Sequence, residues 1–255
     1  MPYGRSHGQE PRTQKEWLLM MIHEMRKLAA ELFGTFALVF AGTGAIVVND
    51  ASGGVVSHVG IAFTFGLIVL AMIYALGDVS GCHLNPAVTL GFFVAKRFEG
   101  HLVVPYIISQ CIGAILASIT IRFIFPLSTT LGATLPAGSF FQSFILEFIL
   151  TLTLMFVILS VSTGSKEKGL LAGVAVGSVI ALEALFAGPI SGASMNPARS
   201  LAPALVSLRL GDLWIYVTAP VLGACAGVLT CRCIQEPECC RSKNHKKPLH
   251  RVERT

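Results

Sequence analysis

The sequence predicts an all-α membrane protein with six transmembrane helices and two re-entrant half-helices in an inverted repeat. The chain is 53% hydrophobic and only 13% charged, with a mean hydropathy of +0.70, far from the values of soluble globular proteins. Six apolar runs are long enough to cross a bilayer. The motif Asn-Pro-Ala occurs once in each half of the chain, at 85–87 and at 196–198.

The six apolar runs give the transmembrane elements in order. They lie at about 28–48, 56–77, 102–125, 140–161, 169–187 and 213–231. Lys and Arg precede the first run, occupy positions 96, 97, 166 and 168, and recur in the tail from Arg232, whereas the connectors 49–55 and 126–139 contain neither. The positive-inside bias therefore predicts six crossings with both termini in the cytoplasm. We expect a multi-pass protein of the cell membrane.

The membrane domain consists of two copies of one unit. Glu31 and Thr35 in the first run match Glu147 and Thr151 in the fourth. Three spans per copy is an odd number, so the second copy is inverted relative to the first. We expect a cytoplasmic tail at 1–27, a membrane domain at 28–233 with repeats at about 28–125 and 140–233, and a basic cytoplasmic tail at 234–255.

Each repeat also contains a short helix that begins at its Asn-Pro-Ala motif. Asn is a preferred N-cap, and Pro is favoured at the first helical position because its missing N–H would have no intrahelical partner there. The apolar segments that follow, 88–95 and 200–206, are about half as long as a span. The functional site is predicted where the two half-helices meet, near the middle of the bilayer.

These features together resemble the aquaporin, or major intrinsic protein, family. The resemblance rests on the paired motifs, the Glu-x3-Thr pattern of the first and fourth runs and the segment Asn-Pro-Ala-Arg-Ser, and it covers about 28–233. Residues 187–197 and 213–216 most resemble the nodulin-26-like branch and its bacterial relatives. The resemblance implies a homotetramer in the lipid bilayer with one pore through each subunit, no cofactor, and no enzymatic activity.

The paired motifs are the first candidate pore residues: Asn85, Pro86 and Ala87, and Asn196, Pro197 and Ala198. In the simpler interpretation each Asn only caps its helix. In the functional interpretation, the cap uses the side-chain oxygen and leaves the NH2 group to donate into the lumen. The two helix N-termini add about half a positive charge each. Water would be attracted to these donors, whereas cations and migrating protons would meet a barrier.

A second candidate site is the outer selectivity constriction that the resemblance implies. Its spacing from the motifs gives Phe65, Ala184, Ala193 and Arg199. Strict water channels of the family carry a histidine at the position of Ala184, so two alanines predict a wider and less polar ring. We expect water and small uncharged solutes to pass, glycerol first, with urea, ammonia or metalloid acids as further candidates. Ser200 and Ala204 resemble water channels, so a strict water channel remains the alternative.

Glu31, Glu147 and His83 are expected to support the re-entrant loops. A buried carboxylate is costly unless it is satisfied, and the duplicated positions favour acceptance of loop N–H groups over proton coupling in a transporter. His83 is interpreted as a hydrogen-bond partner in the lumen, with a pH sensor as the alternative. Glu183 has no assigned role.

Other classes of function fit the sequence less well. A secondary transporter of a small neutral solute would be expected to carry more ionisable residues in its spans. An intramembrane enzyme would need a nucleophile and base or a metal set, and neither is evident. The net charge of +5 does not indicate nucleic-acid binding, because the basic residues lie in the tails. The tail residues Cys231, Cys233, Cys239, Cys240, His245 and His250 match no zinc-ligand spacing, so no metal site is predicted.

Overall fold

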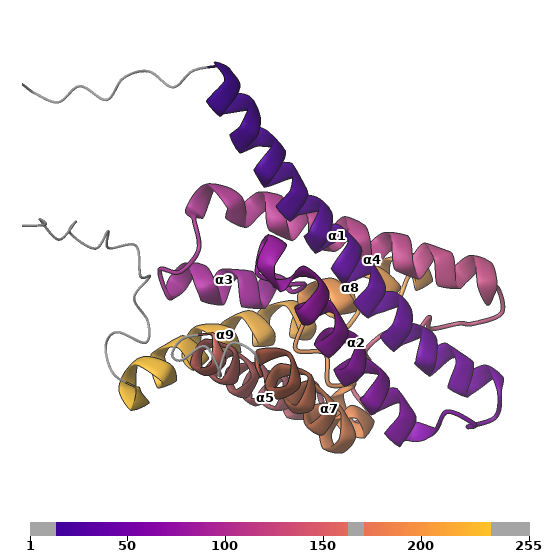
Figure 1. The fold of residues 1–255 in the computed structure, drawn as a ribbon. Helices are drawn as coiled ribbons and strands as arrows, with labels where there is room; N and C mark the ends of the chain where they lie inside the picture. The colour runs from indigo at the N-terminus through magenta and orange to yellow at the C-terminus, as the bar shows by residue number, and fades with distance from the viewer. Residues whose placement is uncertain (1–13, 163–170, 236–255) are drawn as a thin grey trace, which may run out of the picture.

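The computed structural model describes residues 14–162 and 171–235, and this part of the chain is helical (Figure 1). Its helices are α1 Gln14–Ala51, α2 Ser57–Ser80, α3 Pro86–Val94, α4 Gly100–Ile124, α5 Phe140–Val161, α7 Ala172–Ser191, α8 Pro197–Ser207 and α9 Leu213–Ile234. Six of them are long and apolar enough to cross a membrane: α1, α2, α4, α5, α7 and α9. Helices α3 and α8 have only 9 and 11 residues. The predicted fold class is confirmed.

Helix α1 begins at Gln14, well before the predicted start at 28, so residues 14–27 of the predicted tail are helical. Its 38 residues correspond to about 57 Å, nearly twice the hydrocarbon thickness of a bilayer. Figure 1 shows its first turns extending beyond the other helices. The charges between positions 14 and 27 shorten the apolar run, but they do not end a helix that meets no Gly or Pro there. This extension of α1 contacts the start of α4, where His101 Nε2 lies 3.2 Å from Glu24 Oε1 of α1.

The helices pack as two equivalent sets. Helix α1 packs on α2 and α4, and α5 packs in the same way on α7 and α9, while α2 and α7 join the two sets. The contacts use glycines at matching places. A β-carbon at Gly113 of α4 would overlap the carbonyl oxygen of Leu32, and one at Gly223 of α9 would overlap that of Phe148. Close backbone approach through small residues is a common packing mode in lipid.

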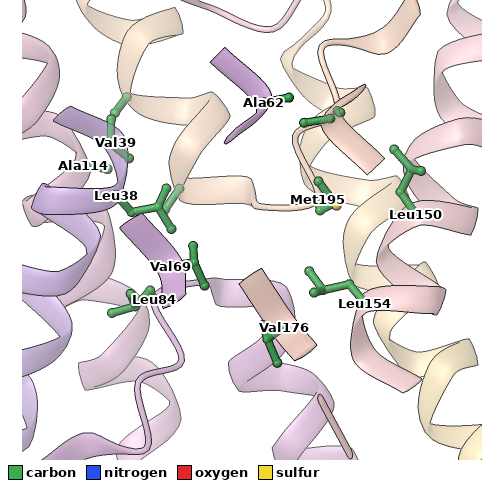
Figure 2. Close-up of a cluster of buried hydrophobic side chains, with 14 of the residues drawn as sticks. Leu38, Val39, Ala62, Val69, Leu84, Ala114, Leu150, Leu154, Val176 and Met195 are labelled. Atoms are coloured by element: carbon green, nitrogen blue, oxygen red, sulfur yellow. The ribbon is translucent and has the colours of Figure 1, made fainter. Parts of the chain in front are cut away.

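Apolar side chains from both sets converge on one central region, where the two loops also meet. Figure 2 shows Leu38 and Val69 facing Leu154 and Val176 across this region. Leu84 and Met195, the residues before the two asparagines, belong to the same buried cluster. Several features named from the sequence, namely Lys166, Lys168, Cys239, Cys240, His245 and His250, lie outside the described residues.

Candidate pore and selectivity site

Both half-helices are capped as the sequence predicts. Asn85 adopts extended backbone angles, and its Oδ1 accepts a hydrogen bond from the N–H of Ala87 at 2.9 Å. Asn196 does the same for α8, accepting from the N–H groups of Ala198 at 3.0 Å and Arg199 at 3.3 Å. In both helices Pro occupies the first turn. The cap orients each Asn so that its NH2 group points away from its own helix.

The two NH2 groups connect the loops to each other. Asn85 Nδ2 donates to the carbonyl of Met195 at 2.7 Å, and Asn196 Nδ2 donates to the carbonyl of Leu84 at 2.8 Å. No local pattern predicts this crossed pair of hydrogen bonds, because it depends on how loops from opposite repeats dock. An amide NH2 carries two hydrogens. One N–H of each Asn therefore holds the opposite loop, and the second is not needed for this contact.

A central cavity of about 130 Å³ runs past both asparagines, and they are among the residues that line it. Its wall combines apolar residues of the transmembrane helices, such as Val69, Leu154 and Val176, with residues of the loops 81–85 and 193–196.

The four residues predicted for the constriction all line this cavity, although they come from four different elements. Phe65 lies on α2, Ala184 on α7, Ala193 in the second loop and Arg199 on α8. The guanidinium carbon of Arg199 lies 5.1 Å from the centroid of the Phe65 ring, within cation–π range. Arg199 is 2% exposed, and its Nη1 donates to the carbonyl of Gly132 at 2.9 Å. Gly132, in the connector before α5, was not predicted to take part.

The loops are held in an unusual backbone conformation. Cys82 and Leu84 have φ angles of 50° and 51°, and Ala193 and Met195 have φ angles of 41° and 54°. Left-handed angles at non-glycine residues cost on the order of 1–3 kcal/mol each, so the surrounding structure must stabilise them. The matching positions of these residues in the two loops show that both repeats use the same backbone path.

The stabilising groups are the two buried glutamates. Glu147 accepts hydrogen bonds from the N–H groups of Ser194 at 2.9 Å and Met195 at 2.8 Å, and from the Ser191 hydroxyl at 2.8 Å. Glu31 accepts the equivalent bonds from His83, Leu84 and Ser80 at 2.9, 2.7 and 2.7 Å, and a further one from Gln110 at 2.8 Å. Each carboxylate therefore satisfies the donors of one loop.

Two tyrosines complete this arrangement, and the sequence analysis missed them. The Tyr106 hydroxyl donates to the carbonyl of Ser80 at 3.0 Å, and the Tyr216 hydroxyl donates to that of Ser191 at 2.7 Å. Both are fully buried. They occupy matching positions on α4 and α9, so a closer alignment of the two repeats could have found them.

His83 lines the cavity on the side of the first loop. Its Nδ1 lies 3.1 Å from the Thr89 hydroxyl, and its ring stacks on Phe92 with 4.6 Å between centroids. Glu183, which had no assigned role, is 3% exposed and is not among the residues that line the cavity. Within residues 14–162 and 171–235, no group of three or more His, Cys, Asp or Glu side chains could hold a metal ion.

Six spans in an inverted repeat, with two capped half-helices that meet beside a central cavity, are the architecture of a membrane channel. Residues 19–231 match the family described as Major intrinsic protein, and the chain belongs to this family. It is 46% identical over 237 residues to Aquaporin NIP1-1 of Oryza sativa subsp. japonica, covering 88% of this chain and 84% of that relative. It is also 46% identical over 220 residues to Aquaporin NIP3-1 of Arabidopsis thaliana, covering 83% and 68%.

Among solved structures, the chain resembles the aquaglyceroporin from Plasmodium falciparum, with 26% identity and a TM-score of 0.73. The match covers 81% of this chain and 94% of that structure. The predicted family and its nodulin-26-like branch are thus confirmed. The protein is a multi-pass membrane channel and not an enzyme.

Proposed function

We propose that this chain is a passive channel for water and small uncharged solutes, glycerol first, and that it excludes protons and ions. The observation that carries the proposal is the composition of the ring on the central cavity. The ring combines one aromatic side chain and one guanidinium with the small side chains of Ala184 and Ala193, and all four residues line the cavity. A carbon chain with hydroxyl groups can contact the Phe65 ring while its hydroxyls bond to Arg199. The likeness to an aquaglyceroporin supports the same conclusion.

Exclusion of ions follows from the polar groups along the lumen. The free N–H groups of Asn85 and Asn196 and the N-termini of α3 and α8 place positive potential at the centre, and Arg199 adds a full charge at the ring. A cation would lose its hydration shell beside these groups without gaining an acceptor of opposite charge. A neutral solute exchanges water for N–H donors and loop carbonyls at little cost.

Glu31, Glu147 and His83 act in this proposal as supports of the loops. We further propose 28–233 as the channel domain, flanked by cytoplasmic tails at 1–27 and 234–255, in a homotetramer of the cell membrane. The connectors without Lys or Arg, 49–55 and 126–139, would then face the outside. Arg199 and its ring would lie at the outer end of each pore.

The alternative, a strict water channel, rested on Ser200 and Ala204. Both are buried and neither is among the residues that line the cavity. The Ser200 hydroxyl instead bonds to those of Thr134, at 2.8 Å, and Ser194. These positions therefore act on the packing around the second loop and carry little weight for the choice of solute.

The test is stopped-flow light scattering on proteoliposomes that contain the full chain. Vesicle shrinkage reports water permeability, and re-swelling in glycerol or urea reports solute entry. We expect both to be fast, with proton flux, followed by a pH-sensitive dye inside the vesicles, at the level of empty liposomes. Fast water without glycerol entry would establish the strict water channel instead. Solute entry that saturates and follows an ion gradient would indicate a transporter.

A further inference from the structure

A carbonyl near the end of α7 lacks its usual partner in the helix. Pro189 lies inside α7 and has no N–H group. The carbonyl four residues earlier, at Leu185, therefore cannot receive the usual helical hydrogen bond from that position. In a membrane-spanning helix, such a group must find a donor elsewhere, because lipid offers none.

The missing donor comes from a different helix. His58, in the first turn of α2, places its Nε2 2.7 Å from the carbonyl oxygen of Leu185. A carbonyl can only accept, so the ring proton resides on this nitrogen. Gly188 provides the room: a β-carbon there would lie 2.8 Å from Cε1 of His58. The Gly-Pro pair on α7 and the histidine on α2 thus fit each other.

The hydrogen bond between His58 and Leu185 lies on the same side of the α2–α7 contact as the ring residues. Helices α2 and α7 are in closest contact at Gly66 and Gly177, where a β-carbon on either residue would come within 2.6 Å of the other's carbonyl oxygen. His58 and Leu185 are both about two turns from that crossing, toward the same end of the helix pair. The ring residues belong to the same stretch, because Phe65 is next to Gly66 and Ala184 is next to Leu185.

We infer that His58 is a positioning residue for the selectivity ring, which sets the separation of Phe65 and Ala184 by donating to the carbonyl that Pro189 leaves free. The inference rests on the proposed role of the ring. The glycine crossing fixes α2 against α7 at one level, and the His58–Leu185 hydrogen bond fixes them at a second. With both in place, the two helices cannot separate at the ring. Loss of one net hydrogen bond shifts a packing equilibrium by about fivefold, so without His58 wider arrangements become populated.

The experiment measures the ratio of glycerol to water permeability for variants of the full chain in proteoliposomes. His58→Leu removes the donor, and we expect the ratio to rise about two- to fivefold, with water permeability retained. His58→Gln keeps an N–H donor and should keep the wild-type ratio. Val59→Ala, at the adjacent and also exposed position of α2, is the matched control and should also keep it.

Pro189→Ala provides the decisive background, because it restores an N–H that can bond to Leu185 within α7. There, His58→Leu should leave the ratio unchanged from Pro189→Ala alone. The inference is overturned if His58→Leu has the wild-type ratio, or if its effect persists in the Pro189→Ala background. If His58→Leu fails to insert, recovery by Pro189→Ala supports the inference, and failure of that recovery overturns it. If the wild-type protein passes no glycerol, the proposed solute range is refuted, but the role of His58 is not. In that case glycerol entry that appears only in His58→Leu would still support the positioning role.

Discussion

Replacing Glu147 with Gln should unfold the second loop at a much lower temperature than the same change at Glu183. Both carboxyl groups are buried in the same half of the molecule, at 0% and 3% exposure. Of these two, only Glu147 accepts hydrogen bonds from the second loop. Glu183 Oε2 has no hydrogen-bond partner in the described part of the chain. The two substitutions are identical in chemistry, so they separate the bonds to the loop from the general effect of losing a buried carboxyl.

The magnitude follows from the individual bonds. Oε1 of Glu147 accepts from Ser191 and Ser194, and Oε2 accepts from the N–H of Met195. A Gln oxygen in the Oε1 position keeps two bonds, but each falls from a charged to a neutral bond, at about 1 kcal/mol apiece. The new NH2 group faces the N–H of Met195 and leaves it unsatisfied, at about 1–3 kcal/mol. The total is about 3–5 kcal/mol, or a fall in Tm of about 10 °C.

The detergent-solubilised protein is heated, and the fraction that remains folded is measured by size-exclusion chromatography. The water permeability of reconstituted vesicles is measured in parallel. Glu147→Gln should lower both the melting temperature and the water permeability per inserted protein. Glu31→Gln should resemble it, whereas Glu183→Gln should stay within about 1 kcal/mol of wild type. Equal melting temperatures for the Glu147 and Glu183 variants would refute the assignment of the loop bonds.

Three further substitutions test the ring and the packing. Ala184→His should narrow the ring and reduce glycerol permeability about tenfold while water flux persists, and unchanged fluxes of both in light scattering would contradict the ring assignment. Arg199→Val should admit protons or ammonium, which a pH-sensitive dye inside the vesicles would detect. Arg122→Val is the control and should admit neither, because the Arg122 guanidinium donates to the carbonyls of Pro126 and Ser128 and does not line the cavity. Gly223→Ala should destabilise the solubilised protein by about 1–3 kcal/mol because its β-carbon meets the carbonyl of Phe148, whereas Gly77→Ala, with no atom within 4 Å, should be neutral or slightly stabilising in the same melt.

Much of the fold could be predicted because a bilayer restricts the possible structures so strongly. Spanning segments must be helical and apolar, so the runs in the sequence translate almost directly into α2, α4, α5, α7 and α9. The half-helices could be predicted because Asn followed by Pro is a signal for the N-terminus of a helix. The start of α1 could not, because hydropathy measures whether a segment prefers lipid and not whether it is helical.

The support of the loops was predictable where the chain repeats itself. Glu31 and Glu147 could be recognised as a pair from their matching contexts, and the structure gives them matching bonds. The crossed bonds of Asn85 and Asn196 join loops from different repeats, and no local pattern records how such loops dock. His58 is a single polar residue at the start of a helix, and its partner is a backbone carbonyl that the sequence marks only through Pro189.

The differences between the two repeats then indicate where selectivity resides. Both loops share the cap, the glutamate, the tyrosine and the strained backbone, so these elements serve the architecture and cannot by themselves distinguish solutes. At equivalent positions after the motifs, the first repeat has Val88 and the second has Arg199, and only the second contributes a charge to the cavity. His83 in the first loop stands where Ser194 stands in the second: the His83 ring stacks on Phe92, whereas the Ser194 hydroxyl bonds to that of Ser200. A duplicated unit can build a symmetric passage, but discrimination between solutes requires groups that the duplication does not share. We therefore expect changes of sequence in the proposed ring around Arg199 to alter what the channel admits.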